Sequence, residues 1–107
     1  MNFLIQNKKS IKAKFFKALA DPIRLEIIDF IAEGEKCVCE IVDQLDIIQP
    51  LASRHLRILR ESGIVTDRRD GTKKMYKLSN KKIKEIIDLL DHNLLKDLSQ
   101  KILQEAL

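Results

Sequence analysis

Apolar residues recur at helical spacing in the first third of the chain. They fall every four residues over 10–20, which predicts a helix there and leaves 1–9 as a short tail or frayed turn. Asp21 and Pro22 predict a fresh helix start, because Asp caps helices and Pro suits the first helical position. This second helix ends just before Gly34. The predicted inward residues are Ile11, Phe15, Leu19, Leu25, Ile28 and Ile31.

Two shorter helical patterns follow, separated by a tight turn. The first covers about Val38–Leu45, and the chain then turns at 46–48. The second runs from about Pro50 to Ser62, where Gly63 ends it. Two helices joined in this way form a helix-turn-helix pattern. The predicted inward side chains are Ile41, Val42, Leu45, Ala52, Leu56 and Leu59.

The period of the pattern changes from helix to strand after Gly63. Residues 64–68 and 74–78 alternate as strands do and flank the segment 69–72. That segment contains Asp-Gly, a strong signal for a tight hairpin turn. The sequence therefore predicts a β-hairpin whose tip is rich in Arg and Lys.

The C-terminal segment 80–107 contains neither Gly nor Pro and keeps an apolar stripe, which predicts one long helix capped by Ser79. At 1.5 Å per residue it is about 40 Å long and overhangs a small domain. An exposed apolar stripe needs a cover, so we expect a symmetric dimer; the alternative is a helix that bends back over its own domain. The stripe consists of Ile83, Ile86, Ile87, Leu90, Leu94, Leu98 and Ile102.

These elements predict a mainly α fold with a β-hairpin wing, that is, a dimeric winged helix-turn-helix. The length suits a single domain over 1–107. Within it we assign 10–20 and 80–107 as terminal dimerisation helices, 38–62 as the helix-turn-helix and 64–78 as the wing. Because no apolar run is long enough for a signal peptide or a membrane span, we expect a cytoplasmic protein that meets no membrane.

The net charge of +4 is concentrated in one segment. Residues 49–77 hold eight Lys or Arg against three acidic residues, a local charge of +5, whereas the rest holds twelve against thirteen, or −1. Such charges usually mark only a solvated face, but here they coincide with the second helix of the pair and the hairpin. A winged helix places these two elements on DNA, so double-stranded operator DNA is the expected partner.

The chemistry of the basic segment separates two kinds of DNA contact. Side chains at the start of the second helix suit base edges, because Arg bonds guanine, Gln bonds adenine and Ser reaches bases or phosphates. Basic side chains on the hairpin suit phosphates or the minor groove. The predicted DNA-binding residues are Gln49, Ser53, Arg54, His55 and Arg57 on the helix and Arg68, Arg69, Lys73 and Lys74 on the hairpin.

Four runs of sequence stand out: FKALADPIRLEIIDFI, EKCVCEIVDQL, QPLASRHLRILRESGIV and DRRDGTKKMYKLS. They lie within about residues 10–90 and together resemble the ArsR/SmtB family, whose members are small dimeric repressors that release operator DNA on binding a metal or metalloid. The run KCVCEIV is similar to the ELCVCDLC box of the arsenic-sensing members. The resemblance implies that Cys37 and Cys39 bind the inducer. It also makes arsenite the first candidate. Thiolates are soft ligands, so Cd(II), Cu(I) and Hg(II) suit the same pair. We expect no required cofactor.

The chain departs from the family's metal sites at defined positions. Val42 stands where the arsenic box has a third cysteine, so two thiolates face an ion that prefers three sulfurs. Water, or a small thiol such as glutathione, would supply the third ligand. Cadmium/lead sensors add N-terminal cysteines, which 1–36 lack. A zinc or nickel site on the last helix needs Asp and His at set spacings, and His92 is the one histidine there. We therefore interpret His92 as a surface residue.

The spacing of the cysteines gives a hypothesis for the response. Residues i and i+2 point about 200° apart on a helix but the same way in an extended segment. Chelation by Cys37 and Cys39 therefore needs a non-helical segment. We expect the inducer to keep or make this segment non-helical, which unwinds the first turn of the short helix and so shifts the recognition helix.

Other interpretations of the pair stay open. Cys37 and Cys39 could simply be small hydrophobic residues of the core. They could also form a sensor of oxidation or of reactive sulfur, although a disulfide within Cys-X-Cys closes a small, strained ring. A thiol metal buffer or chaperone would not need the basic helix and hairpin. Cysteines in one place indicate free thiols in a reducing compartment. We expect no enzyme, because the sequence shows no oriented Cys–His pair, glycine-rich phosphate loop or acidic dyad.

Overall fold

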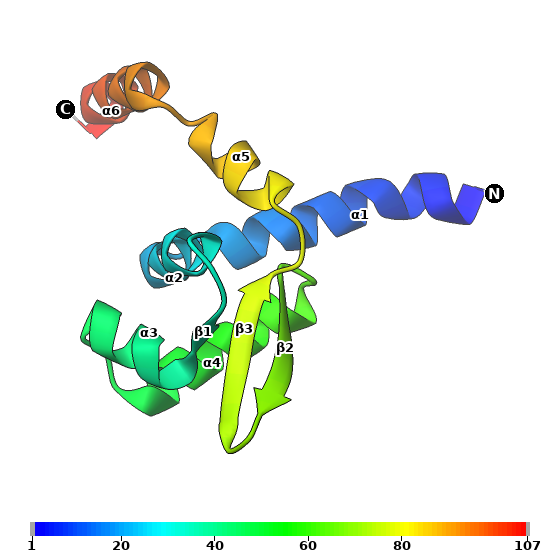
Figure 1. Cartoon of the computed structure of the whole chain (residues 1–107). Helices are drawn as coiled ribbons and strands as arrows, with labels where there is room; N and C mark the ends of the chain where they lie inside the picture. The colour runs from blue at the N-terminus through cyan, green and yellow to red at the C-terminus, as the bar shows by residue number, and fades with distance from the viewer. Residues whose placement is uncertain (1, 107) are drawn as a thin grey trace.

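The computed structural model describes the backbone of residues 2–106 and the side chains of residues 7–106. Three helices pack beside a small antiparallel sheet, and the two terminal helical segments extend away from this body (Figure 1). The elements are α1 (Asn2–Leu19), α2 (Pro22–Ala32), β1 (Lys36–Cys37), α3 (Val38–Leu45), α4 (Gln49–Glu61), β2 (Val65–Asp70), β3 (Lys73–Leu78), α5 (Lys82–Asp88) and α6 (His92–Ala106).

Asp21 separates α1 from α2, as the sequence predicts. Its carboxylate accepts hydrogen bonds from the backbone N–H groups of Ile23 (2.8 Å) and Arg24 (3.2 Å), which a helix start leaves unpaired. Desolvation pushes the pKa of Asp21 up, but these hydrogen bonds outweigh it and hold the pKa below its usual value. The tail expected at 1–9 is wrong. The chain is already helical at Asn2, because Leu, Gln and Lys in this segment are good helix formers.

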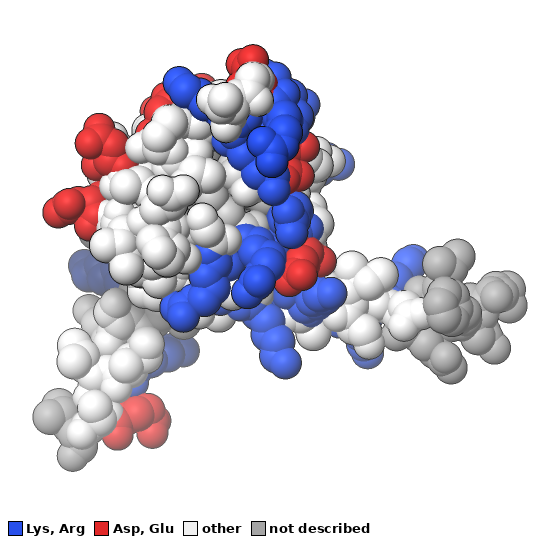
Figure 2. Space-filling model, turned by 90° about the horizontal axis from the view of Figure 1, so that it is seen from below, with Lys and Arg blue, Asp and Glu red and all other residues white. Residues whose placement is uncertain are grey.

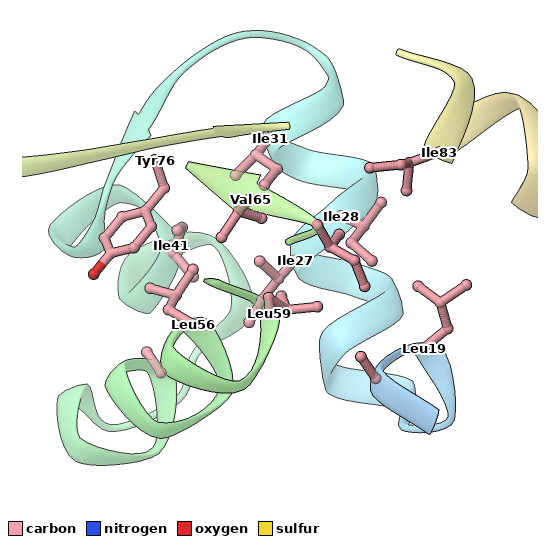
Figure 3. Close-up of a cluster of buried hydrophobic side chains, with 13 residues drawn as sticks. Leu19, Ile27, Ile28, Ile31, Ile41, Leu56, Leu59, Val65, Tyr76 and Ile83 are labelled. Atoms are coloured by element: carbon pink, nitrogen blue, oxygen red, sulfur yellow. The ribbon is translucent and has the colours of Figure 1, made fainter. Parts of the chain in front are cut away.

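The hydrophobic core lies where α2, α3, α4 and the sheet meet (Figure 3). The inward stripe predicted for α4 is confirmed, because all three of its residues are buried. Ile27 is fully buried although the stripe predicted for α2 did not include it, since a second helix face is also covered. Ile11, expected inward, is instead 65% exposed. The largest fully buried side chains are Ile27, Ile28, Ile41, Leu56, Leu59, Ile64 and Val65.

The strands form one antiparallel sheet in the order β1–β3–β2. β2 and β3 are the predicted hairpin, but both are longer than predicted, and Asp70 pairs directly with Lys73. The turn is therefore two residues long, and Gly71 supplies the positive φ of 65° that such a turn needs. Sequence patterning missed β1, since two residues carry no alternation; it pairs Cys37 with Met75 of β3.

The single C-terminal helix expected over 80–107 is wrong. The chain breaks after α5, and Asp91 starts α6 by accepting a hydrogen bond from the backbone N–H of Leu94 (3.0 Å). An Asp side chain competes for backbone donors in this way and favours a new helix start. At the other end, Asn80 rather than Ser79 accepts a hydrogen bond from the first turn of α5.

The helix α6 buries none of its residues against the rest of the chain, so it does not bend back over the core. Together with the outer part of α1 it extends from the body (Figure 1). Within residues 2–106, every helix is too short or too polar to cross a membrane. The large apolar side chains left exposed are Ile11, Phe16, Ile48, Ile86, Leu89, Leu90, Leu94, Leu95, Leu98, Ile102 and Leu103.

Candidate nucleic-acid interface and cysteine pair

The helix α4 presents a polar face beside the wing. The turn that leads to it begins at Asp46, whose left-handed backbone (φ 54°) is a conformation that Asp tolerates. Pro50 in the first turn then favours the helix start. The apolar side of α4 is buried, so its polar side is left outward. The outward positions include Gln49, Ser53, Arg54 and Arg57, four of the predicted DNA contacts.

A cleft of about 700 Å³ is lined by α4, the hairpin and the start of α3. Lys and Arg side chains form a band across the face of the molecule on which these elements lie (Figure 2). No acidic side chain is found among the lining residues, all of which belong to the described part of the chain. The basic ones are Arg54, Arg57, Arg60, Arg69, Lys73 and Lys74.

Asp67 connects the wing to α4. Its carboxylate lies 3.5 Å from a guanidinium nitrogen of Arg60 on α4 and 3.2 Å from Nζ of Lys74 on β3. The hydrogen bond from Lys74, with the positive charges of Lys74 and Arg60, holds the pKa of Asp67 below its usual value despite some desolvation. Arg60 was not among the predicted DNA contacts. Its helical spacing from Arg57, three residues earlier, is the signal that would have placed it on the same face.

Strand alternation places Arg68 away from the cleft. Neighbouring strand residues point to opposite faces, so Arg69 lines the cleft and Arg68 does not. Arg68 instead donates two hydrogen bonds to the Glu35 carboxylate, at 2.6 and 3.0 Å. This hydrogen bonding, opposed by slight desolvation, lowers the pKa of Glu35. The structure therefore does not bring Arg68 together with the other predicted contacts on the wing.

His55 lies on the inner side of α4 and is only 4% exposed. Its Nδ1 is 3.1 Å from Nη1 of Arg24, and because a guanidinium only donates, the ring accepts here and carries its proton on Nε2. Burial lowers the pKa of His55; the charges of Arg24 and Arg54 act in the same direction, and Asp21 opposes them. The prediction that His55 contacts DNA is therefore wrong, because helical periodicity turns this position inward.

Cys37 and Cys39 come together because the backbone changes conformation between them. Cys37 is the last residue of β1 and has an extended backbone (φ −83°, ψ 164°), whereas Cys39 belongs to the first turn of α3. The structure joins their Sγ atoms as a disulfide, in contrast to the expected free thiols. Cys37 is 2% exposed, while Cys39 is exposed, and both line the basic cleft.

Cys37 also caps α3. Its Sγ accepts a hydrogen bond from the backbone N–H of Glu40 (3.2 Å), and the Glu40 carboxylate accepts one from the backbone N–H of Cys37 (3.0 Å). This reciprocal pair is a capping box that stabilises the helix start. Cys37 already lies outside the helix and Cys39 lies in its first turn, so the unwinding of that turn by an inducer stays a prediction.

The two sulfur atoms of Cys37 and Cys39 are the metal ligands that the described residues provide in the cleft. Between residues 7 and 106, no group of three His, Cys, Asp or Glu side chains is placed to hold a metal ion. Val42, at the position of the third box cysteine, packs partly buried against the core. Once reduced, the pair fits a soft ion that takes a further ligand from outside the chain.

A tight helix pair with an exposed polar face on its second helix, beside a basic two-stranded wing, defines a winged helix-turn-helix DNA-binding protein. Residues 21–67 match the model of a bacterial regulatory protein of the arsR family. The chain belongs to this family and is a transcriptional regulator. Regulators of this family bind DNA and form homodimers.

Two relatives and one solved structure show the extent of the similarity. The chain is 48% identical over 80 residues to an uncharacterised HTH-type transcriptional regulator of Methanocaldococcus jannaschii, covering 74% of this chain and 90% of that protein. It is 38% identical over 78 residues to an arsenical resistance operon repressor of Staphylococcus xylosus, covering 73% and 71%. A homodimeric winged helix-turn-helix DNA-binding domain of Mycobacterium bovis, a possible ArsR-family regulator, matches with TM-score 0.71 and 31% identity over 82% of this chain and 80% of that one. The predicted fold class is confirmed.

Proposed function

We propose that this regulator is a repressor that binds operator DNA through α4 and the wing and leaves it when arsenite, or another soft metal(loid), binds Cys37 and Cys39. One observation carries the proposal: the cysteine pair lines the same basic cleft as α4 and the wing. A ligand held there lies within the surface proposed to face DNA. The similarity to an arsenical resistance operon repressor supports arsenite as the first candidate.

The proposed DNA contacts divide by position. The start of α4 enters the major groove in a winged helix, so the polar side chains of its first turns are the proposed base contacts. The basic residues further along α4 and on the wing are the proposed phosphate contacts. The base contacts are Gln49, Ser53 and Arg54, and the phosphate contacts are Arg57, Arg69, Lys73 and Lys74.

Ligand binding acts on α3 and on the cleft at once. Two small thiols or one dithiol must first reduce the disulfide, becoming a disulfide in turn, because thiolates are the ligands. In the disulfide Cys37 Sγ still accepts the hydrogen bond from Glu40, so a ligand acts by bridging the two sulfurs at a wider spacing than the S–S bond, which disturbs the start of α3. The three residues 46–48 alone connect α3 to α4, so a shift of α3 moves the recognition helix. A coupling of a few kcal/mol is enough to release the operator.

Gel retardation with a fragment of the protein's own promoter tests the proposal. Reduced wild type should give a retarded band at low salt, and arsenite should abolish it. The matched control, Cys37→Ser with Cys39→Ser, keeps side-chain size and capping ability and should stay bound with arsenite present. The absence of a band at low salt would contradict DNA binding, and equal release of both proteins would contradict the cysteine site.

The disulfide favours a second candidate on the same fold, a repressor that responds to thiol oxidation. In that reaction the two thiols lose two protons and two electrons to hydrogen peroxide, which becomes two waters. Peroxide should then weaken operator binding without arsenite, and a dithiol should restore it. Equal affinities of the reduced and oxidised protein would exclude this candidate. A thiol buffer or chaperone is less favoured, because it leaves the basic cleft without a role.

We also propose that the partner of the terminal helices is a second copy of the chain. The exposed apolar side chains of α1, α5 and α6 lie on the two segments that extend from the body. A symmetric dimer is the usual way to cover such a face. The homodimeric state of the Mycobacterium bovis relative supports this assignment.

A further inference from the structure

We infer that the basic cleft beside Cys39 binds the carboxylate of a small thiol, whose sulfur completes the coordination of arsenic. The inducer would then be arsenite together with a carboxylate-bearing thiol, rather than arsenite alone. This inference rests on the proposed arsenite binding and specifies the class of molecule that binds with it.

The cleft offers positive charge that no carboxylate of the described residues neutralises. Arg60 and Lys74 share the carboxylate of Asp67. The other basic side chains of the cleft form no ion pair within residues 7–106, and the lining contains no acid. Arginine binds carboxylates through paired hydrogen bonds, and lysine binds them as a point charge. The unpaired side chains are Arg54, Arg57, Arg69 and Lys73.

The size of the cleft and the exposure of the two sulfur atoms determine how a ligand enters. A volume of about 700 Å³ lies within the range of small-molecule sites, about 300–1,000 Å³. Cys37 is sealed, whereas Cys39 is exposed to the cleft. Arsenic held by both sulfurs therefore turns its remaining coordination position toward the cleft and its cations. Val42, at the position of the third box cysteine, packs partly buried against the core and offers no ligand.

Two molecules of the solution thiol first reduce the Cys37–Cys39 disulfide and become a disulfide themselves, and the condensation that follows involves no electron transfer. Arsenite, As(OH)₃, condenses with three thiols, so that three S–As bonds replace three As–O bonds and three waters leave. The chain supplies two of the thiols and the solution supplies one. A neutral thiol can bond to arsenic equally well, but only a thiol that carries an anionic group also pairs with the cations of the cleft. The cations therefore predict a preference by charge among thiols of similar size.

Equilibrium dialysis of arsenite against the reduced, anaerobically desalted full chain tests this preference. The added thiols are 3-mercaptopropionate, 2-mercaptoethanol and cysteamine, which are anionic, neutral and cationic. Arsenic should bind at least tenfold more tightly with 3-mercaptopropionate than with 2-mercaptoethanol, and most weakly with cysteamine. Raising the salt concentration should reduce the difference, because salt screens exposed charges.

A variant pair separates the subsite from the cysteines. Arg57→Gln with Lys73→Gln should lose the preference for 3-mercaptopropionate while binding arsenic normally with 2-mercaptoethanol. The control, Lys77→Gln with Lys81→Gln, removes the same charge from exposed positions outside the cleft and should keep the preference. Equal arsenic affinity with all three thiols would overturn the subsite while leaving arsenite binding intact. Absence of arsenic binding with every thiol would instead overturn the proposed function.

Discussion

Arg24 joins three parts of the molecule through one guanidinium. Nε donates to the carbonyl of Ala18 (2.6 Å) and Nη2 to that of Lys17 (3.4 Å), at the end of α1 where carbonyls lack helical partners. Nη1 donates to His55 on α4. The recognition helix is thus connected to α1 through a single side chain of α2.

The buried ring of His55 predicts a pH-dependent stability. Its pKa is lowered in the folded protein, chiefly by burial, so the unfolded chain takes up the proton first as the pH falls. The contribution of neutral His55 to the free energy of unfolding is fully present above the ordinary pKa of about 6.5. It is lost as the pH falls from there through the lower pKa of the folded protein. Urea unfolding should therefore show a falling free energy of unfolding from pH 7.5 to pH 5.

Two histidine variants check the source of this pH dependence. His55→Gln should flatten the profile and cost about 1–3 kcal/mol at pH 7.5, because a buried hydrogen bond is disturbed. His92→Gln, at an exposed position of α6, should leave the profile unchanged. A wild-type slope that survives in His55→Gln would show that other groups cause it.

Sequence reasoning at the residue scale worked where chemistry and periodicity agreed. It placed the Asp21 cap and the buried stripe of α4. It failed for His55, because the ring was judged by its chemistry although helical spacing turns it inward. It also missed the pairing of Arg68 with Glu35, since these residues are 33 positions apart and no local pattern connects them.

Asp67 determines how much of the cleft's positive charge is available. Asp67→Asn keeps the shape of the side chain but releases Arg60 and Lys74 for phosphate. The slope of log affinity against log salt should become steeper by up to about two units, mainly for random DNA, because each released cation that gains a phosphate contact adds about 0.9. Stability should change by less than about 1 kcal/mol, since the pairs are partly exposed. Fluorescence anisotropy across a salt series measures the slope.

The matched control is Glu26→Gln, which removes the same charge from an exposed position of α2 outside the cleft. Its salt slope should remain at the wild-type value. If both variants steepen the slope equally, net charge rather than the release of the two cations explains the effect.

The existence and type of elements with strong local signals were predicted better than their bounds, and an element set by distant contacts was missed. The helix expected over Val38–Leu45 has those bounds because caps at both ends define it. β1 exists because β3 lies beside it, which no two-residue pattern reveals. The break between α5 and α6 depends on one Asp in an otherwise continuous apolar stripe.

The whole molecule is more extended than a compact domain of its length. The Cα radius of gyration is 16.1 Å, whereas a compact domain of this length has about 13 Å. The extents of 51 × 43 × 22 Å reflect the two terminal segments that leave the body (Figure 1). The length and apolar stripe of the C-terminal segment predicted that it extends beyond the domain. The direction in which it extends depends on the break between α5 and α6.

One substitution on α6 tests the dimer. Leu98→Asp places a charge in the exposed apolar stripe and should weaken self-association at least tenfold, about 1.4 kcal/mol. The fold should be unaffected, because α6 buries none of its residues within the chain. Sedimentation equilibrium measures the association, and circular dichroism checks the fold.

The control for this test is Gln100→Asp, which adds the same charge about 200° around α6. Gln100→Asp should remain dimeric. An unchanged dimer in Leu98→Asp would place the interface elsewhere, and dissociation of both variants would indicate a general effect of charge on α6.

The unequal exposure of the two sulfurs has a consequence for selectivity. A reagent from solution meets Cys39 first and reaches the sealed Cys37 only by forming a second bond. A monofunctional thiol reagent therefore stops at the outer sulfur and leaves the capping hydrogen bond of α3 in place. Only a ligand of valence two or more closes on both. In the proposed mechanism the reduced pair would therefore select an inducer by the number of bonds that the inducer forms, whatever its size or charge.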